Sequence, residues 1–340
     1  MTPASSFSPD HPTVRGVVTI GHAIVDVLAP STDEFLTDNR LVKGSMELVE
    51  QERAVPLYDL MASAGELVVQ SGGSAANTAV VSALLGAPTA FVGKVREDDL
   101  GFAFAKDLAE VGVAFPTRMA SGDGPATGRC LINVTPDAER TMSTFLGAAR
   151  GLRMPDMDEA IFANAAVTYV EGYLWDEPLA HEGLLMAIGM ARGAGRKFSF
   201  TLSDSFLVDR FRDAFHELVP SSVDILFANE HEICSLFETT DLTVAIDRVG
   251  SMCPITTVTR GAEGSLVIVD GKVIEVAAQK VAKVVDTTGA GDAYAGGFLY
   301  GFSEGMSLQR CAEIGNIAAA DVISRMGARP TAALAAAVHG

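Results

Sequence analysis

The sequence has few cysteines and few basic residues for its length. Only four cysteines occur in 340 residues, and no two of them are spaced as a CxxC pair. Neither a disulfide framework nor a zinc site is therefore indicated. Lysine and arginine number 25 against 43 aspartates and glutamates, so the formal net charge is −18. A protein that binds nucleic acid through a basic surface is disfavoured, and we expect no nucleic-acid partner.

Long apolar runs are also missing. None approaches the roughly 18 residues that a membrane helix requires, so no membrane partner is expected. Residues 1–15 lack the basic start and apolar centre of a signal peptide. Their Pro, Ser and Asp content predicts a flexible N-terminus over residues 1–13. Together with the unpaired cysteines, these features predict a cytoplasmic protein.

The chain alternates short β-branched runs with Ala- and Leu-rich helical stretches. Predicted strands span residues 17–20, 89–92, 166–170, 197–202, 224–228, 255–259 and 265–269. Predicted helices span residues 74–85, 100–111, 179–194, 209–218, 290–301 and 308–325. Repeated strand-then-helix order favours a mainly parallel sheet with helices on both faces.

One region breaks this order. Residues 128–135 and 140–146 read as two strands joined at 136–139, where Pro followed by Asp is typical turn chemistry. Residues 24–29 are a candidate third strand. These strands form either a separate small sheet that would serve as a lid over the active site, or an extension at the edge of the main sheet. In the first case the lid comes from roughly residues 24–50 and 116–147, inserted in a large α/β domain spanning 14–340.

Residues 284–298 carry the strongest chemical signal. An apolar strand end runs into a glycine-rich turn and then into a helix whose first turn bears Asp292. Unpaired backbone amides at a helix start favour phosphate, and Gly289 and Gly291 remove side chains that would block its approach. Bound phosphate would repel a carboxylate, so Asp292 should point elsewhere, for example at a proton to be abstracted. The plain alternative is that Asp292 only caps the helix.

Other glycine-rich motifs are excluded at this turn. Tyr294 occupies the third glycine position of G-x-G-x-x-G, the string G-x-x-x-x-G-K-[ST] occurs nowhere in the chain, and residues 284–298 contain no G-x-S-x-G. A dinucleotide fingerprint, an ordinary P-loop and a serine nucleophile elbow are therefore not supported.

Two longer strings resemble known signatures. Residues 286–292, Asp-Thr-Thr-Gly-Ala-Gly-Asp, resemble the C-terminal signature of the ribokinase-like (PfkB-type) sugar and nucleoside kinases. Residues 72–79, Gly-Gly-Ser-Ala-Ala-Asn-Thr-Ala, resemble the N-terminal signature of that family. The resemblance covers nearly the whole chain after the first dozen residues. It implies a ribokinase-like α/β fold with a small β lid, and ATP-dependent phosphorylation of a hydroxyl with ATP and Mg²⁺ as cofactors.

The resemblance assigns roles on the acceptor side of the reaction. Asp292 matches the catalytic base, and the amides of Gly289, Ala290 and Gly291 match the anion hole for the transferring phosphoryl group. These roles agree with phosphoryl transfer, which depends on positioning and charge stabilisation. The residues implied or considered for the substrate pocket are Asp26, Gly72, Gly73, Asn77, His22, Met46, Arg140 and Tyr173.

Further matches concern the nucleotide. Asn229 and Glu232 match an N-x-x-E element that acts near magnesium and the triphosphate, usually through water, as suits a cation that keeps several waters. Thr259, Gly261 and Gly264 would border ATP, and Asn316 would lie beside its adenine or ribose. Taken alone, these residues read as a helix N-terminus, a plain hairpin turn and a solvent-facing helix residue.

A narrower resemblance is to bacterial adenosine kinases, through residues 21–26, 43–46, 139–142 and 171–176. Met46, Tyr173 and Trp175 could supply an apolar wall for a purine, although core packing explains such residues equally well. His22 departs from the pattern because these kinases usually have Asn there. Base selectivity is therefore open.

The predicted function is transfer of the ATP γ-phosphate to the 5′-hydroxyl of adenosine, forming AMP in purine salvage. A kinase for ribose, fructose or a related sugar, or for another nucleoside, is the alternative. A non-catalytic nucleoside- or nucleotide-binding protein is more distant, since both the acid and the anion hole are intact. Monomer and homodimer are both compatible with the sequence.

Overall fold

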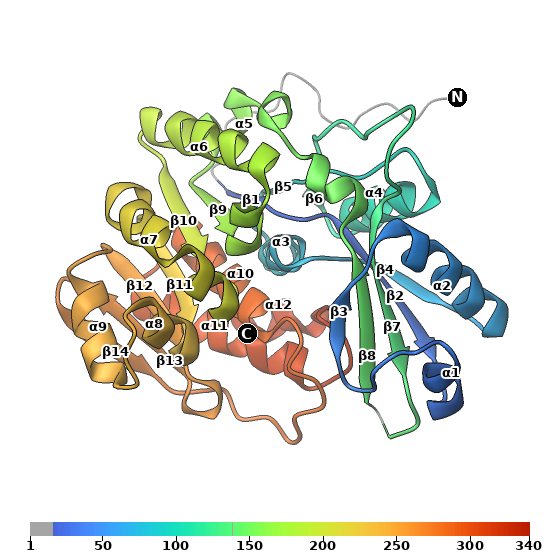
Figure 1. The fold of residues 1–340 in the computed structure, drawn as a ribbon. Coiled ribbons are helices and arrows are strands. Elements are labelled where there is room, and N and C mark those ends of the chain that lie inside the picture. Colours follow the sequence, from blue (N-terminus) through green and yellow to red (C-terminus); the bar gives the residue numbers. More distant parts are fainter. Residues whose placement is uncertain (1–15, 138) are drawn as a thin grey trace.

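Two β-sheets organise the protein. The computed structural model describes residues 16–137 and 139–340, so the prediction for residues 1–13 lies outside the described residues. Within them, a nine-stranded sheet has the order β14-β13-β12-β11-β10-β9-β1-β5-β6, and a five-stranded sheet has the order β3-β8-β7-β2-β4. Figure 1 shows the small sheet at one side of the molecule, with α1 and α2 beyond it.

The elements have the following bounds. The large sheet contains β1 (Val17–Ile20), β5 (Thr89–Val92), β6 (Val113–Ala114), β9 (Val167–Glu171), β10 (Lys197–Thr201), β11 (Ile225–Asn229), β12 (Ile255–Thr259), β13 (Ser265–Val269) and β14 (Lys272–Val276). The small sheet contains β2 (Ile24–Pro30), β3 (Met46–Leu48), β4 (Val68–Gly72), β7 (Gly128–Val134) and β8 (Arg140–Phe145).

The helices have the bounds α1 (Asp33–Asp38), α2 (Gln51–Ala64), α3 (Ser74–Leu84), α4 (Asp99–Glu110), α5 (Glu159–Asn164), α6 (Pro178–Gly193), α7 (Ser205–Ser222), α8 (Glu230–Leu236), α9 (Leu242–Gly250), α10 (Ala290–Ser303), α11 (Leu308–Ile323) and α12 (Ala333–His339). The 3₁₀ turns are η1 (Gly147–Gly151), η2 (Met154–Asp156), η3 (Gly172–Asp176) and η4 (Gly261–Glu263). None of the described helices is long and apolar enough to cross a membrane.

The large sheet confirms the predicted mainly parallel architecture. Its strands pair in parallel from β6 through to β12, and among the described strands of this sheet the antiparallel pairs are β12 with β13 and β13 with β14. Every residue of β1 is buried, as expected of a parallel strand covered on both faces. The neighbours Val17 and Val18 belong to two different apolar clusters because successive side chains of a strand point to opposite faces.

Helices cover both faces, also as predicted. Phe298 of α10 packs in the cluster that contains Val17, and Leu184 of α6 packs in the cluster that contains Val18. The predicted element boundaries hold within a few residues. The largest difference is α7, predicted over residues 209–218, which begins earlier because the Asp204 side chain caps it by accepting from the Phe206 amide.

The hairpin region forms a separate sheet rather than an extension of the main one. Strand β2 pairs in parallel with β7 and antiparallel with β4, and β7 pairs antiparallel with β8. Strands β3 and β4 carry no clear sequence signal, and β4 lies outside the two segments expected to supply the lid. One face of this sheet bears Asp26, whose register partner in β7 is Cys130. The division into a large domain and a lid stays a prediction.

Candidate active site

A cavity of about 240 Å³ lies where the parallel strands β9 to β12 end. The carboxyl edge of such a sheet is the usual place for ligands in α/β proteins. Its lining residues are Ser74, Tyr169, Tyr173, Thr201, Ser203, Phe227, Ala228, Asn229, Glu232, Thr257, Thr259, Gly289, Gly291, Asp292 and Tyr294. The cavity therefore brings together the predicted residues Tyr173, Asn229, Glu232, Thr259, Gly289, Gly291 and Asp292.

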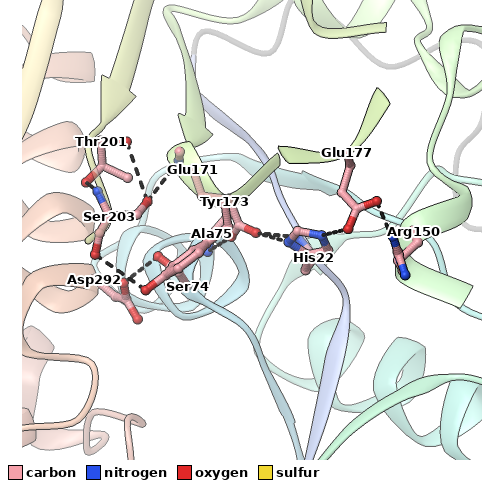
Figure 2. A network of polar contacts seen from close by, with 11 residues as sticks. His22, Ser74, Ala75, Arg150, Glu171, Tyr173, Glu177, Thr201, Ser203 and Asp292 are labelled. Atoms are coloured by element: carbon pink, nitrogen blue, oxygen red, sulfur yellow. Dashed lines mark hydrogen bonds and ion pairs between the residues drawn. The ribbon is translucent and has the colours of Figure 1, made fainter. Parts of the chain in front are cut away.

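Asp292 stands in the first turn of α10, and its carboxylate is turned towards α3. The Ser74 hydroxyl donates to Oδ1 over 2.7 Å (Figure 2). The Asn77 side-chain amide donates to Oδ2 over 3.0 Å. Removal from water raises the pKa of Asp292 to about 6, although both hydrogen bonds favour the charged form. A held carboxylate with a pKa near neutrality suits a general base.

The glycine-rich turn before α10 leaves room for an anion. Gly289 has a φ of 75°, in the left-handed region that favours glycine. A Cβ on Gly291 would meet nothing within 4 Å. Within the described part of the chain, the amides of Gly289 and Gly291 donate no hydrogen bond, whereas the Ala290 amide donates to the Thr287 carbonyl over 3.2 Å. Two of the three predicted anion-hole amides are thus unengaged, and the third is used by the turn.

Asp26 and the two signature glycines meet at the junction of the two sheets. A Cβ on Gly72 would lie 2.5 Å from Oδ2 of Asp26, and one on Gly73 would lie 2.2 Å from the carbonyl oxygen of His22. Only glycine allows these close approaches. Removal from water raises the pKa of Asp26 to about 6, while the charges of Arg329 and Arg140 oppose that rise.

His22 is buried in an ionic network that begins beside the cavity. Glu171 accepts from both the backbone amide and Nδ1 of His22, over 2.7 and 2.8 Å, and from the Ala75 amide over 2.9 Å. Glu177 lies 3.9 Å from Nε2 of His22 and accepts from Arg150. Burial alone would lower the pKa of His22, but the two glutamates raise it to about 9. Figure 2 follows this network from Asp292 to Arg150.

Arg140 joins the small sheet to the glycine-rich turn. Its Nη1 lies 2.9 Å from Oδ2 of Asp286 and 3.3 Å from the Thr288 hydroxyl. Its Nε and Nη2 are buried and have no hydrogen-bond partner among the described residues. Donors left free beside the glycine-rich turn are suited to a phosphate oxygen.

Asn229 and Glu232 close a capping box at the start of α8. The Glu232 carboxylate accepts from the amide and the side chain of Asn229, over 3.0 and 2.7 Å, and Asn229 accepts from the Glu232 amide over 2.8 Å. Burial raises the pKa of Glu232 to about 7. Both carboxylate oxygens of Glu232 already accept hydrogen bonds from Asn229. Glu232 is therefore suited to contact a magnesium ion through a bound water rather than to coordinate it directly. The described residues contain no group of three or more potential metal ligands.

Other predicted residues serve the fold or lie away from the cavity. Gly264 has a φ of 91°, and a Cβ there would lie 2.1 Å from the Val276 carbonyl oxygen. Asn316 is buried and donates to the carbonyls of Val276 and Ala277, over 3.2 and 3.1 Å, so its amide nitrogen ties α11 to the end of β14 and the residue that follows it. Gly261 has a φ of 54° in η4.

The proposed purine wall is only partly assembled. Tyr173 lines the cavity. Met46 is 56% exposed on the edge strand β3, and Trp175 packs in the core against Phe200 and Phe215. The tertiary fold therefore separates residues that the sequence suggested as one surface.

Sequence reasoning missed three polar residues near the acids. Ser74 and Glu171 both lie in the quoted strings, but nothing in those strings indicated their contacts with Asp292 and His22. Arg329 donates through Nε to the Ser71 carbonyl over 3.0 Å and lies 3.4 Å from Asp107. Its Nη1 is buried without a partner among the described residues. No local pattern marks Arg329, because its contacts come from distant segments.

The mainly parallel sheet, the companion β-sheet and an acid at the start of a helix beside a glycine-rich turn define a ribokinase-like fold. The chain belongs to the pfkB family of carbohydrate kinases, whose sequence profile matches residues 41–334. It is a phosphotransferase that acts on a hydroxyl group.

Individual relatives agree with this assignment. Adenosine kinase from Sinorhizobium meliloti is 45% identical with a TM-score of 0.85, covering 95% of this chain and 98% of the relative. A protein described as a probable sugar kinase from Rhizobium etli CFN 42 is 44% identical with a TM-score of 0.87, covering 96% and 98%. Adenosine kinase 2 from Arabidopsis thaliana is 28% identical over 329 residues, covering 91% of this chain and 93% of the relative.

Proposed function

We propose that the protein transfers the γ-phosphate of ATP to the 5′-hydroxyl of adenosine, forming AMP and ADP. The observation that carries this proposal is the position of Asp292. Its carboxylate lines the cavity and is held by Ser74 and Asn77, the residues that follow the glycine pair beside Asp26. A hydroxyl bound between Asp26 and Asp292 would present its proton to a fixed base.

In the proposed reaction Asp292, the glycine-rich turn and Arg140 each have a separate role. Asp292 takes the proton of the 5′-hydroxyl as its oxygen attacks the γ-phosphorus, and the bond to the bridging oxygen of ADP breaks. The amides of Gly289 and Gly291 donate to the oxygens of the phosphoryl group while it is being transferred. Arg140 supplies further donors from the small sheet. Ala290 joins them only if its amide leaves Thr287.

The nucleotide would lie along Asn229, Thr259, Gly261 and Gly264, with magnesium carried by its phosphates. Bound Mg²⁺ would neutralise charge on the triphosphate, and Glu232 would hold one of its waters. Asn316 contributes indirectly, by fixing the end of β14 and the residue that follows it. We place this reaction in purine salvage in the cytoplasm, which the four free cysteines and the use of ATP support.

A nucleoside is favoured over a sugar by the inner face of the small sheet. Ile24 lies on the same face of β2 as Asp26, and it clusters with Cys130 and Ile132 of β7. Met142 of β8 packs against this cluster. Apolar area next to a hydroxyl-binding acid suits a purine base carried on a ribose, and a bare sugar has no comparable group to place there.

The likeness to the Rhizobium etli protein supports a sugar kinase as the second candidate. Initial rates with ATP and Mg²⁺ should be compared for adenosine, guanosine, uridine, ribose and fructose. We expect the highest kcat/KM with adenosine. Selective use of ribose or fructose would replace the proposed acceptor while leaving the family assignment intact.

A further inference from the structure

A second cavity, of about 540 Å³, shares no lining residue with the first. Its walls come from the segment after β5, from the loop between β6 and β7, from η1 and the residues after it, and from α6. Its lining residues are Lys94, Arg96, Arg118, Met119, Ala120, Ser121, Asp123, Gly124, Pro125, Ala148, Gly151, Arg153 and Leu179. Four of these side chains are basic and one is acidic. That balance is the reverse of the whole chain, which has 25 basic and 43 acidic residues.

The basic side chains differ in how they are neutralised. Lys94 is buried and lies 2.5 Å from Oδ1 of Asp156, so its charge is matched within the protein. Arg96, Arg118 and Arg153 have no carboxylate within ion-pair distance among the described residues. Asp123 lines the same cavity but pairs with none of them.

The cavity wall is tied in place rather than being a loose surface loop. Arg96 and Ala120 form a β-bridge, in which the Ala120 amide donates to Val95 over 2.8 Å and the Glu97 amide donates to Ala120 over 2.9 Å. The Arg96 amide also donates to the Thr127 hydroxyl over 3.0 Å. The loop that carries Arg118 is therefore held against the backbone of Arg96.

We infer that this cavity binds a phosphate-bearing small molecule with at least two negative charges. Arg118 and Arg153 are exposed and Arg96 is half-buried, and none of the three has an ion-pair partner among the described residues, so an anion in the cavity would supply the missing opposite charge. Guanidinium groups also match phosphate oxygens in geometry as well as charge. Met119, Pro125 and Leu179 line the same cavity and give an apolar surface to the organic part of such a ligand. The cavity volume is within the range of small-molecule sites.

Calorimetric titration of the intact protein tests this inference. A non-hydrolysable ATP analogue with Mg²⁺ and adenosine are both present at saturation to fill the first cavity and the proposed acceptor site, and pyrophosphate, ribose 5-phosphate and AMP are the probes. We expect at least one probe to bind, and the order of affinity separates an inorganic phosphate site from a site for a phosphorylated organic molecule.

Charge reversal locates the binding. Arg118→Glu and Arg153→Glu should each weaken the binding about tenfold or more, as expected for loss of one charge-assisted contact. Arg192→Glu, at the exposed end of α6 and outside the cavity, should change it less than about twofold. A rate of the kinase reaction that matches the wild type, with the same ATP and acceptor, shows that each variant is folded. Absence of binding up to about 10 mM of every probe, a limit corresponding to less than 3 kcal/mol, overturns the inference. So does equal weakening by Arg192→Glu.

Discussion

Ser74 and Asp292 lie 218 positions apart in the chain, and the hydroxyl of the first donates to the carboxylate of the second over 2.7 Å. This contact joins the start of α3 to the start of α10, the two helices that carry the family signatures. It holds the carboxylate, which lines the cavity, against the start of α3. The base proposed for the reaction is therefore fixed by hydrogen bonds from a different helix from its own.

Asp292→Asn should abolish most turnover, because an amide cannot take the hydroxyl proton. We expect kcat to fall about 10²- to 10⁴-fold, the usual contribution of a positioned base, while adenosine binding survives. Steady-state kinetics and calorimetry measure the two effects. Asp213→Asn, on the exposed surface of α7, is the matched control and should leave both unchanged. Retained turnover in Asp292→Asn would remove Asp292 from the role of base.

The pH profile of kcat/KM should show an acidic limb near pH 6. The pKa of Asp292 and that of Asp26 are both raised to about 6 by removal from water. Protonation removes the base in one case and a charged hydroxyl acceptor in the other, so activity falls as pH decreases through 6. With both groups titrating the limb should be steeper than one proton, and Asp26→Asn should make it shallower. A flat profile down to pH 5 would contradict this expectation.

Ser74→Ala should move the acidic limb upward. The Ser74 hydroxyl favours the charged carboxylate, so its loss raises the pKa of Asp292 further. The variant should therefore lose more activity at pH 6 than at pH 8. Ser63→Ala, at an exposed position of α2, serves as control. An equal loss at both pH values would indicate a structural role for Ser74 instead.

Arg140→Ala should weaken the link between the small sheet and the glycine-rich turn. We expect kcat/KM to fall by about 10- to 100-fold, the range for loss of a hydrogen bond to a charged group. Arg140→Lys should recover only part of it, since a lysine lacks the guanidinium fork. Lys43→Ala removes ion pairs of the same small-sheet region with the exposed Asp33 and Asp137, and should change the rate less than about threefold.

His22→Asn should change the pH dependence of stability. Because the pKa of His22 is raised from 6.5 to about 9, its ionic contacts stabilise the fold fully below pH 6.5, and this contribution is lost as pH rises through 9. The contribution is about 3 kcal/mol. Urea unfolding at pH 6 and pH 9.5 should show a fall in the free energy of unfolding for the wild type that exceeds the fall for the variant. Equal falls would contradict a charged His22.

The same variant tests base selectivity. Asparagine is the residue usual at this position in the adenosine kinases that the sequence resembles, and it can both donate and accept hydrogen bonds. An imidazolium only donates. We expect His22→Asn to change the ratio of kcat/KM for adenosine to that for guanosine, measured in the same assay. An unchanged ratio would show that His22 acts on stability alone.

Seven of the nine strands of the large sheet were predicted because each is a short, largely buried run rich in β-branched residues, whereas the edge strands β6 and β14 were not. Strand β1, for example, was predicted with its observed bounds, Val17–Ile20. Strands β3 and β4 were not predicted, since Met46, Leu48 and Val68 are more than half exposed and show no buried alternation. Edge strands are formed by pairing with a neighbour, and that neighbour is distant in the sequence.

The sequence by itself determined the family, the strand-then-helix alternation that gives a mainly parallel sheet, and the residues of both signatures, because these depend on local patterns. Only the tertiary structure decided that the hairpin forms its own sheet, that Asn316 braces the backbone, and that Trp175 belongs to the core. It also decided the contacts of Glu171 and Arg329, and it gathered around one cavity three arginines that have no ion-pair partner among the described residues. Such contacts join segments far apart in the chain, and their geometry arises only when the helices and sheets pack together.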